Sequence, residues 1–184
     1  MVAPYVPTAV ANHFVEQFAN QSGGIEHMKL QKLVYCAYGW WLAVNGLQGN
    51  RLTTEGPEIW RHGPVFSSMY RTFRIFGRQP IFEPQSANPM LPPVNVDEDD
   101  NYTRNFIRWV WGRYGHLSGF ELSDLTHRPG SPWYRTAMDR NFQVAPNTRI
   151  PDEYIHEEFS RLLNADRAQA QNNVQNSAES AIHA

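Results

Sequence analysis

The stretch from Glu26 to Asn45 constrains the fold more than any other part of the chain. It reads EHMKLQKLVYCAYGWWLAVN and carries an apolar stripe at helical spacing, made of Leu30, Leu33, Val34, Ala37, Trp41 and Val44. Further methionine, leucine and aromatic residues make the other faces apolar as well. Because a helix that is apolar all round must be covered by other elements, the stretch predicts a central, buried helix over about residues 26–45.

Weaker helical patterns surround this segment. Helices are predicted over residues 8–19, 63–76, 101–114 and 118–128, and again beyond Ser131. Gly63-Pro64 has the form of a cap followed by a first helical residue. Glycines and a proline interrupt residues 46–62, which favours a small β-hairpin or an extended segment near 50–62. The expected fold is therefore mainly α, a compact single domain around the central apolar helix.

The domain boundaries follow from length and local composition. A chain of 184 residues is most simply one domain, and the helical patterning covers about residues 8–163. Residues 79–96 are rich in proline, which predicts an ordered but irregular surface segment. From residue 164 to 184 the chain is mostly Ala, Gln, Asn and Ser, which predicts a flexible, low-complexity tail.

Composition excludes several classes of function. The net charge of -2 and the pI near 6.4 argue against general nucleic-acid binding. Cys36 is the one cysteine, so an internal disulfide framework is excluded and a reducing compartment, the cytoplasm, is expected. No apolar run is long enough to span a membrane, and the first residues lack the features of a secretory signal.

No cofactor or metal is predicted. The sequence has neither a P-loop nor a dinucleotide-binding fingerprint. The seven histidines are dispersed, and His156 lacks the second histidine that a zincin helix requires.

The segment from Glu121 to Trp133 is the one that admits two interpretations. Asp124 and His127 lie three residues apart on one predicted helical face, close to Ser123, which is a possible catalytic arrangement. The same segment also fits the end of one helix and the start of the next, since Pro129 disfavours helical geometry at the residue before it. Neither serine lies in a nucleophile elbow, so the structural interpretation is favoured and the catalytic one stays open.

The segment's flanks support the structural interpretation. Ser118 and Glu121 fit a capping box at the start of one helix. Ser131 and Pro132 fit the cap and first residue of the next helix.

Three blocks of the sequence, in this order and spacing, resemble the Panacea domain, also called the SocA-like family. They are Lys29–Trp40, Glu58–Val65 and Leu122–Trp133, and the resemblance extends over about residues 10–163. Members occur in bacterial and phage genomes, which places the family with prophages and phage defence. The resemblance implies a mainly α-helical antitoxin, without catalysis, that neutralises a cognate toxin by direct protein–protein binding. The toxin is expected to be encoded next to it.

The namesake member of the family supplies an alternative, because it is an adaptor that delivers its toxin to the AAA+ protease ClpXP. The catalytic use of His127 and Asp124 is a third, less favoured alternative. Homo-oligomerisation stays open.

The candidate partner-binding residues come partly from the matched blocks and partly from charge. Within the blocks, Arg61 and His62 precede Gly63-Pro64, while His127 and Trp133 bracket a turn and could form a shallow aromatic site. Outside them, Arg71, Arg74 and Arg78 are spaced as one stripe of a helix and would suit an acidic toxin surface. A solvated face is the alternative for these arginines.

Overall fold

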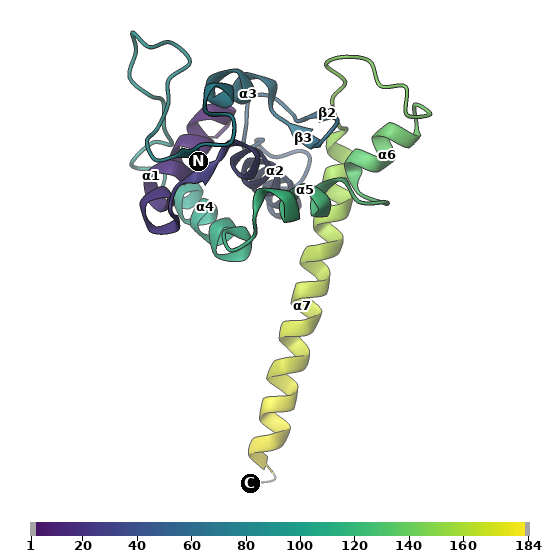
Figure 1. The fold of residues 1–184 in the computed structure, drawn as a ribbon. Helices are drawn as coiled ribbons and strands as arrows, with labels where there is room; N and C mark the ends of the chain where they lie inside the picture. Colours follow the sequence, from purple (N-terminus) through teal and green to yellow (C-terminus); the bar gives the residue numbers. More distant parts are fainter. Residues whose placement is uncertain (1–2, 183–184) are drawn as a thin grey trace.

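The computed structural model describes residues 3–182 of the chain. Short two-stranded sheets accompany a set of helices, as Figure 1 shows. In chain order the elements are α1 (Pro7–Ser22), β1 (Ile25–Glu26), α2 (His27–Asn45), β2 (Glu58–Trp60), β3 (Gly63–Val65), α3 (Ser67–Phe73), the 3-10 helix η1 (Arg74–Phe76), β4 (Pro80–Ile81), α4 (Asn101–Tyr114), α5 (Gly119–His127), α6 (Pro132–Met138) and α7 (Asp152–Ile182). The predicted mainly α fold is confirmed.

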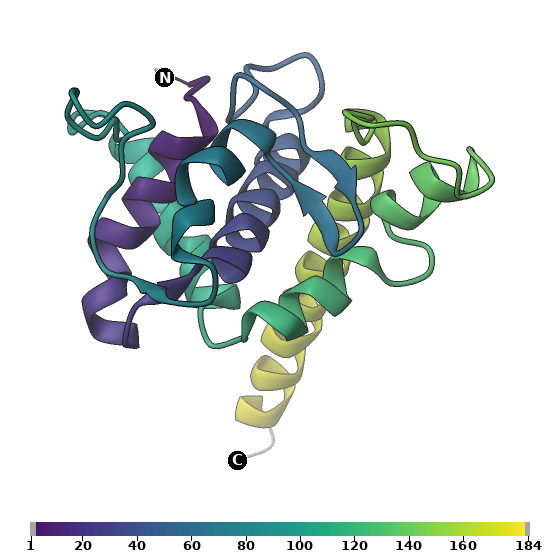
Figure 2. The same ribbon diagram turned by 45° about the horizontal axis from the view of Figure 1, so that its top comes forward.

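Helix α2 occupies the centre of the domain, as its all-round apolar sequence predicts. Figure 2 shows it between α1 and α7, and it also packs against α4 and α5. Both Trp40 and Trp41 are fully buried, and their indole N–H groups donate to the Tyr114 hydroxyl and the Asn50 carbonyl. Gly39 lies against the ring of Phe159 on α7, where a Cβ would collide. A glycine in the middle of α2 thus allows α7 to dock closely.

The hairpin lies slightly later in the chain than predicted. Strands β2 and β3 pair antiparallel with Ile59 opposite Pro64, so the turn falls at Arg61 and His62. The expectation that Gly63-Pro64 begins a helix is wrong, because these two residues form β3 and α3 begins at Ser67. The φ angle of Gly63 is +95°. This value suits a sharp turn, and residues other than glycine rarely adopt it.

The proline-rich segment is irregular, as expected, and one buried side chain anchors it. No helix or strand is assigned to the described residues 82–100. The Asn12 amide, on α1, donates to the carbonyls of Gln85 at 2.8 Å and Val94 at 2.7 Å, and its oxygen accepts from the Gln85 N–H at 2.8 Å. The segment is therefore fixed across α1 by three hydrogen bonds.

Helix α7 has a docked part and a projecting part. Ile155 and Phe159 are buried against the domain, whereas the C-terminal half of the helix extends away from it in Figure 1. The predicted low-complexity tail over 164–184 is helical as far as Ile182, and its last two residues lie outside the described range. Its flexibility stays a prediction. Within residues 3–182, no helix is both long and apolar enough to cross a bilayer.

Candidate functional site

Side chains from three helices, α2, α5 and α6, meet at the β2–β3 hairpin. The Lys32 ammonium, on α2, donates to the Pro64 carbonyl at 2.9 Å. The Ser123 hydroxyl, on α5, donates to the His62 carbonyl at 3.0 Å. A third bond runs from the Trp133 indole N–H, on α6, to the Trp60 carbonyl at 2.8 Å. The hairpin is therefore held by side chains of three helices, while its turn residues Arg61 and His62 are exposed.

The segment from Glu121 to Trp133 forms the helix ends that its sequence predicts. Ser118 and Glu121 make the reciprocal capping box at the start of α5. Ser131 caps α6 by accepting from the Tyr134 N–H at 3.2 Å, and Pro132 is the first residue of α6. These caps set the angle between α5 and α6, which brings Trp133 over the hairpin.

The contacts of Ser123 and His127 differ from those of a catalytic pair. His127 Nδ1 makes a short hydrogen bond to the Ser123 carbonyl oxygen. Since a carbonyl oxygen can only accept, Nδ1 carries the proton. The Ser123 hydroxyl donates away from the imidazole, to the backbone of His62. The His127 ring packs edge-on against Trp133 at 5.5 Å between centroids. Ser123 thus fixes α5 to the hairpin, while His127 packs against Trp133 on α6.

The side chains that could bind a metal ion do not cluster among the described residues. Among the residues that the structure describes, no three His, Cys, Asp or Glu side chains gather where they could hold a metal ion. The Cys36 thiol is buried in α2, and this burial raises its pKa to about 12, which suits an inert thiol.

A pocket of about 230 Å³ opens beside the hairpin, and we call it the Lys32 pocket. Its walls come from α2, the hairpin and α3, and include His27, Met28, Lys32, Trp60, His62 and Tyr70. The Tyr70 ring lies 4.8 Å from the Trp60 ring and 5.1 Å from the His27 ring, measured between centroids. Aromatic rings therefore make up much of the lining, and Lys32 is one of the lining residues.

Lys32 is unusual because its side chain is only 1% exposed. Burial lowers the pKa of its ammonium group to about 7. The nearby His27 imidazole is also buried, and this burial, together with the charge of Lys32, lowers the His27 pKa to about 4. The pocket thus holds a neutral histidine beside a lysine that is only half protonated near neutral pH.

The predicted partner-binding residues fall into separate places. Arg61 and His62 form the exposed turn of the hairpin and line the Lys32 pocket. Arg71, Arg74 and Arg78 are exposed, but they do not share one helix as the spacing predicted. Helix α3 ends at Phe73, so Arg74 begins η1 and Arg78 follows it. Arg71 lines a different hollow, next to Glu55 and the proline-rich segment.

Trp133 lies in the first turn of α6 and is half-buried, with its indole N–H bonded to the hairpin. It lines a hollow of about 400 Å³ together with Trp60, Arg61 and Phe142. His127 lies on the other side of its ring. Trp133 therefore supports the hairpin, and the shallow aromatic site at this turn stays a prediction.

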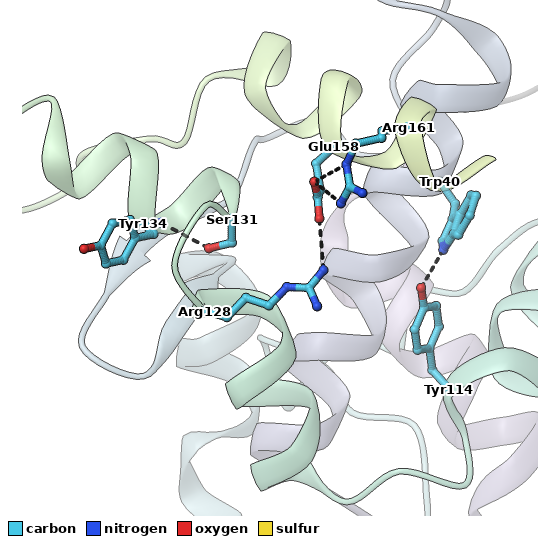
Figure 3. Close-up of polar contacts among 7 residues, drawn as sticks. All are labelled: Trp40, Tyr114, Arg128, Ser131, Tyr134, Glu158 and Arg161. Carbon is cyan, nitrogen blue, oxygen red and sulfur yellow. Dashed lines mark hydrogen bonds and ion pairs between the residues drawn. The ribbon is translucent and has the colours of Figure 1, made fainter. Parts of the chain in front are cut away.

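A third hollow, of about 370 Å³, lies between α5, α6 and α7. In Figure 3, Arg128 and Arg161 both reach Glu158, with Arg128 Nη2 at 3.3 Å and Arg161 Nη2 at 2.9 Å from its carboxylate oxygens. Because Arg128 is the C-cap of α5, this carboxylate ties the turn before α6 to the docked part of α7. The buried Tyr35 hydroxyl at this hollow has no hydrogen-bond partner among the described residues.

Sequence reasoning missed Lys32 and Tyr70. A signal for Lys32 was present, because it lies next to Leu33 in a helix with no polar face, where a lysine has nowhere to reach water. Tyr70 gave no such signal, since its place beside Trp60 depends on how the hairpin packs against α3.

The comparisons with known proteins agree with the resemblance seen in the sequence. The family model described as "Antitoxin SocA-like, Panacea domain" matches residues 30–134, more than half of the chain. The chain is also similar to a curated protein named Antitoxin SocA from Caulobacter vibrioides (strain NA1000 / CB15N). The two are 28% identical over 154 residues, which cover 82% of this chain and 80% of the relative. No solved structure matches the chain significantly.

Proposed function

This chain belongs to the SocA-like Panacea domain family of antitoxins, and we propose that it neutralises a cognate toxin by binding it directly through the hairpin face. We define the hairpin face as the turn residues Arg61 and His62 together with the Lys32 pocket. The toxin is a protein, and we expect its gene to be the immediate neighbour. Both proteins would act in the cytoplasm, in a bacterial or prophage setting.

The observation that carries the proposal is the convergence of three segments on the hairpin. Lys32, Ser123 and Trp133 each hydrogen-bond a backbone carbonyl of residues 60–64, and all three lie within the matched region. A loop fixed from three sides presents its exposed turn in one conformation. Such preorganisation lowers the entropy lost on binding and suits recognition of a protein partner.

The contacts of the hydroxyl and imidazole groups support a role without catalysis. Ser123 donates to backbone, and His127 Nδ1 also bonds backbone. A nucleophile and its base would instead bond to each other.

The second candidate function is that of an adaptor for a AAA+ protease. The projecting half of α7 favours it, because a helix that extends beyond the domain is suited to a second contact (Figure 1). In this alternative the hairpin face still holds the toxin, and α7 contacts the protease. Deleting residues 166–184 should then stop degradation of the toxin by the protease while leaving toxin binding unchanged.

The proposal is tested by co-expressing the chain with the product of the neighbouring gene. Neutralisation by binding predicts restored growth and a complex that co-elutes on size-exclusion chromatography. Restored growth with loss of the neighbour's product, dependent on a protease, would favour the adaptor instead. The test variant is Arg61→Glu, a substitution at an exposed position in the turn, which should weaken the complex while leaving the melting temperature unchanged. If growth is not restored, the antitoxin proposal is wrong for this pair.

A further inference from the structure

We propose that the Lys32 pocket receives an acidic side chain of the toxin, whose carboxylate pairs with the Lys32 ammonium. The inference rests on the proposed function for the identity of the partner, and it adds the chemistry of the contact. The partner residue is a glutamate or an aspartate that inserts between the hairpin and α3.

The first argument is that Lys32 has unused hydrogen-bonding capacity. An ammonium group has three donors. The described contacts give it one acceptor, the Pro64 carbonyl at 2.9 Å. A buried cation is normally paired, because an unpaired one loses most of its hydration. The geometry therefore leaves an incomplete site, which a carboxylate would complete with charge-assisted hydrogen bonds.

The second argument is charge. Among the described residues that line the Lys32 pocket there is no Asp or Glu, whereas Arg61 and His62 lie at its mouth. Arg74 and Arg78, which follow Tyr70 in the chain, are exposed and do not line the pocket. The potential at the opening is therefore positive, which favours an acidic group over a neutral or basic one.

The third argument is size and shape. A volume of about 230 Å³ is smaller than the roughly 300–1,000 Å³ typical of pockets for drug-sized ligands. It suits one side chain. The walls are aromatic at Trp60 and Tyr70, so the methylene groups of a glutamate would lie against rings while its carboxylate reaches Lys32. A central charged anchor with an apolar surround resembles the hot spots that dominate many protein interfaces.

Proton uptake on binding gives a test that needs no substitution. In the free protein the Lys32 pKa is about 7, so most molecules carry a neutral amine at pH 8. A bound carboxylate favours the protonated form, so complex formation at pH 8 should take up about one proton. The titratable groups that also face the pocket are His27, His62 and Tyr70, with Arg61 as a fixed charge. Calorimetry in two buffers of different ionisation enthalpy measures the uptake.

The substitution Lys32→Met identifies the source of that proton and of the affinity. It should lower the affinity for the co-purified neighbour about 10- to 100-fold, the range for losing a hydrogen bond between charged groups. The uptake at pH 8 should disappear. Lys29→Met is the matched control, because Lys29 lies on the same helix but contacts Gly115 and Trp111 outside the pocket. Its affinity should match that of the wild type. Equal affinity for the Lys32→Met and wild-type proteins would overturn the inference.

A small-molecule probe separates this inference from the proposed function. Propionate carries a carboxylate on a short apolar tail and needs no toxin. An NMR titration should give saturable shifts of the Trp60 indole N–H in the wild type, in the millimolar range, and none in Lys32→Met. If the neighbour is not neutralised but propionate binds in this way, the pocket is a carboxylate site and the antitoxin proposal fails alone. If propionate produces no saturable shift in the wild type, the pocket does not recognise carboxylates and this inference fails.

Discussion

Replacing Lys32 with methionine should stabilise the free protein near neutral pH, even though it removes a buried hydrogen bond. Methionine has a similar length and no charge, so it fills the same space in α2 without a cation to desolvate. The ammonium group of Lys32 has an ordinary pKa of 10.5 when the chain is unfolded and about 7 in the fold. The unfolded chain therefore binds more protons between these values, and this lysine opposes folding at every pH below its ordinary pKa of 10.5.

The magnitude follows from this difference in pKa. Each pKa unit corresponds to about 1.4 kcal/mol, so the lysine lowers the free energy of unfolding by roughly 4 kcal/mol at pH 7 and by only about 1.5 kcal/mol at pH 9.5. Losing the bond to Pro64 offsets about 1 kcal/mol of the gain. The Lys32→Met variant should thus be about 3 kcal/mol more stable than the wild type at pH 7, and nearly equal to it at pH 9.5.

Urea unfolding of both proteins at the two pH values measures this difference directly. Comparing them at each pH cancels the titration of groups that do not interact with Lys32. The control Lys29→Met should be less stable than the wild type at pH 7, because Lys29 is half-exposed and loses a 2.6 Å bond to the Gly115 carbonyl. A Lys32→Met variant less stable than the wild type at pH 7, or a difference that does not change with pH, would refute the reasoning.

Three further predictions concern the fold. Ser118→Ala removes the capping box with Glu121 and should lower the free energy of unfolding by about 1 kcal/mol in urea. Gly63→Ala should destabilise by about 1–3 kcal/mol in the same assay, because φ is +95° and the new Cβ would lie 2.8 Å from Lys32 Nζ; unchanged stability would mean that the turn tolerates another conformation. The Cys36 thiol, whose burial raises its pKa to about 12, should react with a thiol reagent only at the rate of unfolding, and rapid labelling of the native protein would contradict its placement.

Local sequence rules predicted the elements whose cause is local. The apolar residues on every face of 26–45 required a covered helix, and α2 is central. Ser118, Ser131 and Pro132 predicted where α5 and α6 begin, because capping depends on residues three or four apart. The Gly63-Pro64 prediction was wrong because a proline without an N–H fits a short strand as well as a helix start.

The candidate site could be predicted only in part, since its geometry depends on contacts between distant segments. Arg61 and His62 were selected from the family resemblance, and the structure places them at the mouth of the Lys32 pocket. The pocket itself forms where α2, the hairpin and α3 pack together. The residue spacing within any one of these segments does not predict how they pack. The arginine stripe was inferred from a continuous helix, and the end of α3 at Phe73 separates Arg74 and Arg78 from Arg71.

The most direct test of the account is hydrogen–deuterium exchange of the chain, alone and in complex with the neighbour's product. Direct neutralisation through the hairpin face predicts slower exchange at Glu58–Val65 and at the start of α3 in the complex. The capped ends of α5 and α6 should change little, because they support the hairpin from behind. Protection confined to α7, with unchanged exchange at Arg61 and His62, would contradict the account and assign toxin binding to the projecting helix.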